Sequence, residues 1–394
     1  MQDVVIASAV RTPIGIYMGS LADQRSQDLA AVSMKAAIAG AGIDSSHVDI
    51  CIYSEAKQSS FPANIGRHGW LLAGLAENTA GFTMNTLCAG AIQTMISAYS
   101  KIIAGEYTTI MTGGIETNSQ AQHYLVHPRY KFGRENACFY DSKEEVEKNA
   151  QPVNKYGELM NADIADIIAG NYDFHREQIV EYAFKSKLKA RNAIKSGLFK
   201  EAIVPVLKKV KKTEVTIDID DGAAEASLST LLAEPVINRD GTATVGNIAP
   251  LADGSASILM LAGDKAKELG CKTMGKVAGF GIAAGHPVCI EKTTIKSIDK
   301  ALKFASLTLK DIDFIDLHEP SGAYALAVTT QLGSDAADKI NVDGGSLGFG
   351  HAGAATGGFM VVNMVRRLQR TGAHYGLVNV GALGGQSLSI IITA

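Results

Sequence analysis

The sequence contains no apolar run of transmembrane length, and its N-terminus, with Asp3 inside an early strand pattern, lacks the form of a secretory signal peptide. Its formal net charge is only −3 over 394 residues. A nearly balanced charge gives no reason to expect nucleic acid or an acidic membrane surface as a partner. We therefore expect a cytoplasmic protein that binds neither nucleic acid nor membrane.

Cysteine is scattered along the chain rather than clustered. The five cysteines are odd in number and show no CxxC or Cys/His spacing; they are Cys51, Cys88, Cys138, Cys271 and Cys289. This distribution argues against a disulfide framework and against a zinc site. We expect reduced thiols and no bound metal.

Apolar residues and glycine are plentiful, with 46% hydrophobic residues and 40 glycines. A chain of this length and composition can form two or three domains with large cores. Segments with strand spacing alternate with segments of helical spacing, which is typical of an α/β protein. Strands are expected at 3–8, 48–53, 81–84 and 108–112, and helices at 29–41 and 91–103.

The chain also repeats itself. Residues 43–55 align with residues 307–319 at an offset of 264, and each segment follows an Ala-rich helix pattern and ends on a Glu after a strand. The same offset carries Cys88 to position 352, beside His351 in a Gly-rich stretch that again precedes a helix pattern. So long a period indicates a duplicated domain rather than a solenoid. Two copies that face each other would bring Cys88 and His351 together.

Residues 119–245 separate the two copies and are more charged and irregular than the rest. They include one clear amphipathic helix pattern at 177–193. Long insertions of this kind are usually functional lids or binding loops. We expect this segment to fold over the site.

Cys88 lies where a strand pattern meets the start of a helix pattern. Unpaired N–H groups and the helix dipole at such a junction favour the thiolate, which is the nucleophilic form. The small neighbours Ala89 and Gly90 leave room for a substrate. His351 could take the thiol proton and form an ion pair. The alternatives are a buried core cysteine and an incidental histidine in a Gly-rich helix start.

His318 and Glu319 end the corresponding strand of the second copy. His318 could donate a hydrogen bond to a substrate carbonyl, directly or through a water, and Glu319 could orient another group; the alternative is a solvent-exposed pair. A thioester intermediate also needs oxyanion donors. The backbone N–H groups of Cys88 and of residues 381–385, which include Gly381 and Leu383, could supply them.

Several segments, in this order, resemble the thiolase family, and the resemblance covers almost the whole chain. Residues 85–90 are similar to the family's acyl-accepting cysteine motif, residues 113–116 to its G-G-x-E segment, and residues 8–15 to its opening. Residues 197–206 and 240–247, followed by Asp253 and Gly254, are similar to landmarks of the family's loop domain and its exit.

The resemblance implies a five-layered α/β/α/β/α fold of two duplicated halves plus a loop domain. The N-terminal half would comprise residues 1–118 and 246–274, the CoA-covering loop domain residues 119–245, and the C-terminal half residues 275–394. Coenzyme A thioesters would be the substrates, with no permanently bound cofactor. A homodimer or homotetramer is implied.

The resemblance also implies roles for individual residues. Cys88 would carry the acyl group, His351 would activate it, and His318 would hold the water or thioester oxygen of the first oxyanion site. Residues that align with the family's CoA contacts are Met160, Asn247 and Ala249. The implied activity is acyl transfer from CoA, with the making or cleavage of a 3-oxoacyl-CoA carbon–carbon bond.

The sequence departs from the family where the second catalytic cysteine is expected. Gly381 fills one of its two known positions and Pro320 fills the other, so neither position has a thiol. The candidates to replace it as the base are Cys289, His318 and Glu319. A non-standard acceptor or an accessory subunit would also account for the loss.

Two other functions stay open at this point. A weakly active or non-catalytic CoA-ester-binding subunit would not need the second base. A ketoacyl-synthase-like condensing enzyme shares the fold and could use a Cys-His-His set built from Cys88, His318 and His351.

Overall fold

The computed structural model describes residues 2–126 and 138–394 of the chain. Ten strands form one mixed sheet, and two two-stranded sheets lie outside it. The strands of the large sheet are β1 (Val4–Arg11), β2 (Gly15–Ile16), β3 (Ile50–Ser54), β4 (Ala80–Met84), β5 (Thr109–Thr117), β10 (Ala252–Ala262), β11 (Gly275–Ala284), β12 (Phe314–Leu317), β13 (Tyr375–Ala382) and β14 (Gln386–Thr393). The small sheets pair β6 (His123–Leu125) with β7 (Phe139–Asp141), and β8 (Val206–Val210) with β9 (Thr213–Ile217).

Four strands in each half of the large sheet share one topology, and β2 and β4 of the first half have no counterpart in the second. In the first half β3 runs parallel to β5, and β10 runs antiparallel between β5 and β1. In the second half β12 runs parallel to β13, and β14 runs antiparallel between β13 and β11. The halves meet where β1 pairs with β11 over only two residue pairs. This topology is the duplication that the 264-residue offset predicted.

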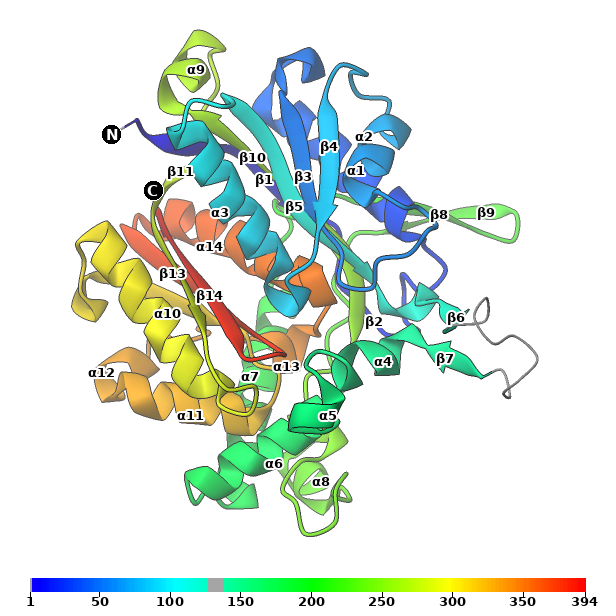
Figure 1. Cartoon of the computed structure of the whole chain (residues 1–394), viewed down its shortest axis with the longest axis vertical. Helices are drawn as coiled ribbons and strands as arrows, with labels where there is room; N and C mark the ends of the chain where they lie inside the picture. Colours follow the sequence, from blue (N-terminus) through cyan, green and yellow to red (C-terminus); the bar gives the residue numbers. More distant parts are fainter. Residues whose placement is uncertain (1, 127–137) are drawn as a thin grey trace.

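Helices cover both halves of the sheet in layers. The helices are α1 (Ser26–Ala41), α2 (Ile65–Leu72), α3 (Gly90–Ile103), α4 (Ser142–Lys148), α5 (Val153–Tyr156), α6 (Asn161–Asn171), α7 (Arg176–Lys195), α8 (Leu228–Ala233), α9 (Gly263–Glu268), α10 (Ile290–Ala305), α11 (Gly322–Leu332), α12 (Ser334–Ala337), α13 (Ser346–Phe349) and α14 (Thr356–Thr371). Figure 1 shows α3 and α14 side by side between the two halves of the sheet. Helices α1 and α2 pack outside the first half, and α10 and α11 outside the second.

Glycine allows the central helices to approach closely. A Cβ on Gly357 of α14 would lie 2.7 Å from Cγ1 of Ile92 on α3, and a Cβ on Gly358 would lie 3.3 Å from Cβ of Ala91. Real Cβ atoms do not tolerate the first of these distances. Because α3 and α14 follow Cys88 and His351, their close packing brings the two candidate residues together.

The expected helices and strands are present, with shifted ends. Strand β13 ends at Ala382, because Gly384 and Gly385 turn the chain at φ of +77° and +78° into β14. Residues 142–233 between β5 and β10 form helices α4 to α8, which occupy the lower part of Figure 1, and the hairpin β8–β9. No helix in the described residues has the length and apolar character needed to span a membrane.

Candidate active site

Cys88 lies in a single 3-10 turn, Leu87–Ala89, between β4 and α3. The turn is fixed by its neighbours: Leu87 has φ of +52°, and its amide donates a 2.8 Å hydrogen bond to the side chain of Asn85. The thiol is partly buried. It lines a pocket, so the sulfur lies at the surface of a cavity rather than inside the core.

The structure brings Cys88 and His351 together, as the repeat predicted. Nε2 of His351 lies 3.1 Å from Sγ of Cys88. The backbone of His351 is fixed on both sides, because its N–H donates to Pro250 at 2.7 Å and its carbonyl accepts from Ala252 at 2.9 Å. Nδ1 lies 2.7 Å from the hydroxyl of Thr356 at the start of α14. The imidazole is therefore held in one position before any substrate arrives.

Burial keeps this pair neutral at rest. It raises the pKa of the Cys88 thiol to about 12, with a further rise from Glu147 and Glu116; Lys57 and the Leu383 amide act in the opposite direction. Burial also lowers the pKa of His351 well below its usual value, and His318 and Lys57 lower it further. The resting pair is a thiol whose S–H donates to Nε2 of His351.

The direction of both pKa shifts disfavours the resting thiolate that the sequence suggested. A helix N-terminus lowers a thiol pKa by partial charge, but loss of hydration penalises the whole charge of the thiolate. With S–H donating to Nε2, the neutral His351 carries its hydrogen on Nδ1 and donates it to Thr356. The thiolate then forms only as the proton moves to His351.

His318 is fully buried just after β12, so the solvent-exposed alternative is wrong. Its ring centroid lies 4.5 Å from that of His351. Nδ1 lies 3.1 Å from the carbonyl oxygen of Gly381. Burial lowers the pKa of His318 to about 4, so the ring is neutral near pH 7. Cys88, His351 and His318 thus form one cluster contributed by both halves of the chain.

Glu319 is also buried, but it faces away from this cluster into a network of its own. Its carboxylate accepts hydrogen bonds from Ser186 at 2.6 Å and Tyr182 at 3.2 Å on α7, and from Asn341 at 2.6 Å. The Leu347 amide of α13 is a further donor, at 3.3 Å. Burial raises the pKa of Glu319. The network ties α7 to the segment that leads to His351.

Glu116, the last residue of the G-G-x-E segment, ties the loops of the site together. Its carboxylate accepts hydrogen bonds from the backbone amides of Ala56, Lys57 and Ala354, each at 3.1 Å. Ala354 follows His351 and Lys57 lines the Cys88 pocket. The carboxylate therefore fixes both walls of the pocket to β5.

The pocket at Cys88 extends between the two halves and the helices α4 and α6. Its lining includes the polar residues Lys57, Asn118, Lys143, Glu147 and Asn161. None of these five was singled out from the sequence. Each lies far from Cys88 along the chain or in a segment without a distinctive motif, so only the folded chain reveals them.

The three residues aligned with CoA contacts lie apart from the lining of this pocket. Met160 precedes α6, and its neighbour Asn161 lines the pocket instead. Asn247 is buried and bonded internally, with its amide donating to the Thr242 carbonyl at 2.9 Å. The Ala249 amide donates to Pro320 at 3.1 Å. Their contacts with CoA stay predictions.

The place of the missing second thiol is filled by other groups. A Cβ on Gly381 would collide with the hydroxyl of Tyr324 and would lie 2.9 Å from Cγ2 of Ile290. That hydroxyl is held by Thr294 Oγ1 at 2.6 Å. Position 381 therefore has no room for a side chain as the protein is packed.

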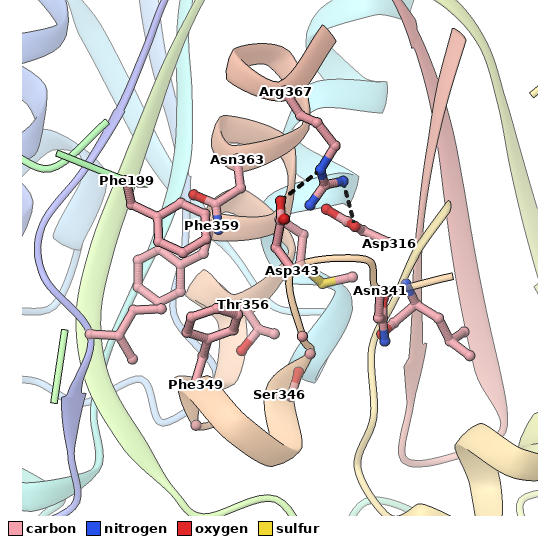
Figure 2. A pocket seen from close by; sticks show the side chains of 16 residues that line it. Phe199, Asp316, Asn341, Asp343, Ser346, Phe349, Thr356, Phe359, Asn363 and Arg367 are labelled. Atoms are coloured by element: carbon pink, nitrogen blue, oxygen red, sulfur yellow. Dashed lines mark hydrogen bonds and ion pairs between the residues drawn. The ribbon is translucent and has the colours of Figure 1, made fainter. Parts of the chain in front are cut away.

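Behind His351 lies a second cavity, lined by Thr356, Asp316, Asp343 and Arg367 (Figure 2). Arg367 of α14 donates to Asp316 of β12 at 2.8 Å and to Asp343 at 2.9 Å. All three charges are buried or nearly so. The ion pairs join the strand that leads to His318 to the helix that follows His351, so the cavity belongs to the framework of the site.

Fold and site together define a duplicated α/β protein in which one half supplies a pocket cysteine and the other supplies the histidine that contacts it. Family models for the thiolase N-terminal domain and the thiolase C-terminal domain match residues 4–264 and 271–394. The chain belongs to the thiolase family. This membership confirms the family and the fold that the sequence predicted.

Characterised relatives match over their full length. The chain is 32% identical to the acetyl-CoA acetyltransferase of Escherichia coli over 397 residues, covering 100% of this chain and 99% of that protein. It is 30% identical to the mitochondrial 3-ketoacyl-CoA thiolase of Rattus norvegicus over 397 residues, covering 100% and 98%.

Solved structures agree with the chain throughout. The acetyl-CoA acetyltransferase of Bacillus anthracis superposes with a TM-score of 0.94 at 29% identity, covering 100% of this chain and 99% of that one. Human mitochondrial 3-ketoacyl-CoA thiolase in complex with CoA superposes with a TM-score of 0.91 at 27% identity, covering 100% and 98%.

Proposed function

We propose that this protein is a thiolase-type acyltransferase that forms an acyl-cysteine on Cys88 from a CoA thioester and makes or cleaves a 3-oxoacyl-CoA carbon–carbon bond. The main support is the 3.1 Å contact between Sγ of Cys88 and Nε2 of His351 at a pocket wall. The names of the relatives support acyl-CoA substrates.

The first half-reaction follows from the resting pair. As Sγ attacks the thioester carbon, Nε2 of His351 takes the thiol proton, and the electron pair of the S–H bond forms the new C–S bond. The developing oxyanion accepts from backbone amides, for which we propose Cys88 and Leu383. The C–S bond to CoA then breaks, and His351 returns the proton to the leaving thiolate. His351 is neutral before and after, as its lowered pKa favours.

The remaining assignments are part of this proposal. Residues 119–245 would cover the CoA, with Met160, Asn247 and Ala249 along its path, between an N-terminal half of residues 1–118 and 246–274 and a C-terminal half of residues 275–394. Gly381 would contribute to the oxyanion side of the site through its backbone, and Glu319 would support the site by holding α7 against α13. We also propose a homodimer or homotetramer, with or without an accessory subunit, in the cytoplasm, and no permanently bound cofactor.

One observation favours a second candidate function, a CoA-ester-binding subunit with little activity. Gly381 and Pro320 leave both known positions of the second thiol without sulfur. Such a subunit would not need the preformed Cys88–His351 contact, which is why we rank it second. The ketoacyl-synthase-like alternative would use the same three residues but would consume a carboxylated acceptor.

Acyl-enzyme trapping tests the proposal. The protein is mixed with acetyl-CoA or acetoacetyl-CoA, quenched in acid and examined by peptide mass spectrometry, while free CoA is followed in parallel. With acetyl-CoA we expect an acetyl adduct on Cys88 and an equimolar release of CoA. With acetoacetyl-CoA we expect the same adduct and an equimolar release of acetyl-CoA, and Cys88→Ala should show neither. Ligand-induced thermal stabilisation that is equal in the wild type and Cys88→Ala, with no adduct, would instead identify the binding subunit. Release of CO₂ from malonyl-CoA during condensation would identify the ketoacyl-synthase-like enzyme.

A further inference from the structure

The carbon–carbon step of the proposed reaction needs a base for the α-proton of the acceptor thioester. A base must reach that proton and must present an unprotonated lone pair. Among the candidate bases that the sequence offered, His318 lies beside the imidazole that contacts Cys88, with ring centroids 4.5 Å apart, whereas Glu319 is bonded in its own network. His351 is committed to the thiol of Cys88 in the first half-reaction. His318 is therefore the candidate for this base.

The hydrogen bond of His318 fixes its tautomer. A carbonyl oxygen can only accept, so the 3.1 Å contact between Nδ1 and the Gly381 carbonyl places the ring hydrogen on Nδ1. Because burial keeps the ring neutral, Nε2 then carries a lone pair and no hydrogen. A nitrogen without a hydrogen cannot donate to an oxyanion, so this tautomer disfavours direct donation by Nε2 to a thioester oxygen.

Nε2 of His318 is also without a partner. It is fully buried and makes no hydrogen bond to any group in the described residues, whereas each nitrogen of His351 makes one. A buried polar atom without a partner is uncommon in folded proteins and calls for an explanation. Here the atom belongs to a ring 4.5 Å from the imidazole that contacts the nucleophile.

The surroundings of Gly381 link this lone pair to the missing thiol. The same residue that accepts the Nδ1–H bond stands where one family position has its second cysteine. Its backbone orients His318, while Tyr324 and Ile290 fill the space in which a side chain at 381 would lie. Position 381 thus lacks the thiol that the family has there, and its backbone carbonyl instead orients the imidazole of His318.

We propose that His318, through Nε2, is the general base that removes the α-proton of the acceptor acyl-CoA in place of the absent second cysteine. This inference rests on the proposed thiolase-type function. The acceptor's Cα–H bond breaks, its proton goes to Nε2, and its electron pair forms the new bond to the acyl carbon on Cys88. The bond from that carbon to Sγ breaks, leaving a thiolate that is reprotonated from the His318 imidazolium.

The distance between the two rings sets an order of events. His318 and His351 depress each other's protonation, because two imidazolium charges with ring centroids 4.5 Å apart repel in a buried site. His351 must therefore pass its proton to the first CoA before His318 accepts one from the acceptor. The two half-reactions are separated in time by this repulsion.

The test compares two half-reactions in His318→Asn and His318→Ala. Cys88 acylation is followed by mass spectrometry with acetyl-CoA, and α-proton abstraction by deuterium uptake into the methyl group of acetyl-CoA in D₂O. We expect both variants to keep acylation within about threefold of the wild type and to lose deuterium uptake by about 100-fold or more, because a positioned base typically contributes about 100-fold to 10,000-fold. Asn, which keeps a hydrogen-bond donor, should not restore the uptake.

Other outcomes overturn the inference. Deuterium uptake that is retained in His318→Asn and lost in His318→Ala would make His318 a hydrogen-bond donor. Equal losses of Cys88 acylation and of deuterium uptake would make His318 a structural residue. A wild type that is acylated on Cys88 but takes up no deuterium would show that the protein removes no α-proton. A wild type in which Cys88 is never acylated would instead defeat the proposed function.

One measurement does not depend on variants that fold. In wild-type protein with ¹⁵N-labelled histidine, the ring-nitrogen shifts of His318 report its tautomer near pH 7. We expect a hydrogen on Nδ1 and none on Nε2. The opposite tautomer would refute the proposal.

Discussion

Asp220→Asn should destabilise the whole protein, because Asp220 holds residues of the central insertion against both halves. Its carboxylate accepts from Nη1 and Nη2 of Arg11 at 2.6 and 2.8 Å and from the Ile14 amide at 2.8 Å. Both side chains of the ion pair are essentially unexposed. Arg11 also donates to Asn363 of α14 at 3.1 Å. The substitution leaves a guanidinium buried without its counter-charge.

The size of the effect follows from that burial. Breaking a buried ion pair by removing one partner costs about 3–5 kcal/mol. With an unfolding entropy of about 2.1 cal/mol/K per residue, this corresponds to a fall in Tm of about 4–6 °C for a chain of this length. The control is Glu225→Gln in the same segment, whose partner Arg191 lies 2.9 Å away with Glu225 mostly exposed. Its Tm should change by no more than about 1 °C, because exposed ion pairs contribute about 0–1 kcal/mol.

Differential scanning fluorimetry measures the Tm of Asp220→Asn, Glu225→Gln and the wild type. A double variant, Arg11→Met with Asp220→Leu, should recover part of the loss, because apolar side chains of similar size remove the uncompensated charge. Equal Tm values for Asp220→Asn and Glu225→Gln would refute the reasoning. So would a double variant less stable than Asp220→Asn.

Two further predictions concern pH and packing. Burial lowers the folded-state pKa of His318 to about 4, below its usual 6.5, so between these pH values the unfolded chain binds more protons than the folded one. The stability of the protein should therefore fall as the pH decreases from 6.5 toward 4, and the Tm of His318→Asn should fall less over this range. Curves of Tm against pH that run parallel for the wild type and His318→Asn would contradict the assignment. Gly357→Ala should lower the Tm by forcing α14 away from α3, at a cost of about 1–3 kcal/mol. Gly170→Ala, where a Cβ would meet nothing within 4 Å, should not lower the Tm. A calorimetric Tm that is lower for Gly170→Ala than for Gly357→Ala would exclude this packing argument.

The architecture could be predicted from the sequence to a greater extent than the chemistry of the site. The 264-residue offset predicted two equivalent halves, and the strand orders around β5 and β13 are equivalent. It also paired Cys88 with His351, whose sequence separation of 263 residues is close to that offset. Repetition can be read from a sequence because each copy must bury the same faces of the same elements, so the apolar pattern recurs.

Protonation states could not be read in this way. A cysteine before a helix suggested a thiolate, whereas burial raises the pKa of the Cys88 thiol. The pattern left open whether His318 and Glu319 are exposed, and the fold buries both. Burial by the folded chain raises the pKa of Cys88, and the charge of Glu147 on α4 raises it further. Local sequence does not encode how much water a side chain will lose.

By itself, then, the order of residues determined the family, the fold and the pairing of Cys88 with His351, because these depend on periodic burial and on motifs that stay contiguous along the chain. Only the folded chain decided that the resting thiol is neutral, that Nδ1 of His318 faces the Gly381 carbonyl, and that Tyr324 fills the place of the lost cysteine. Each of these depends on the relative placement of groups tens or hundreds of residues apart, where a shift of 1 Å changes which atom carries a proton.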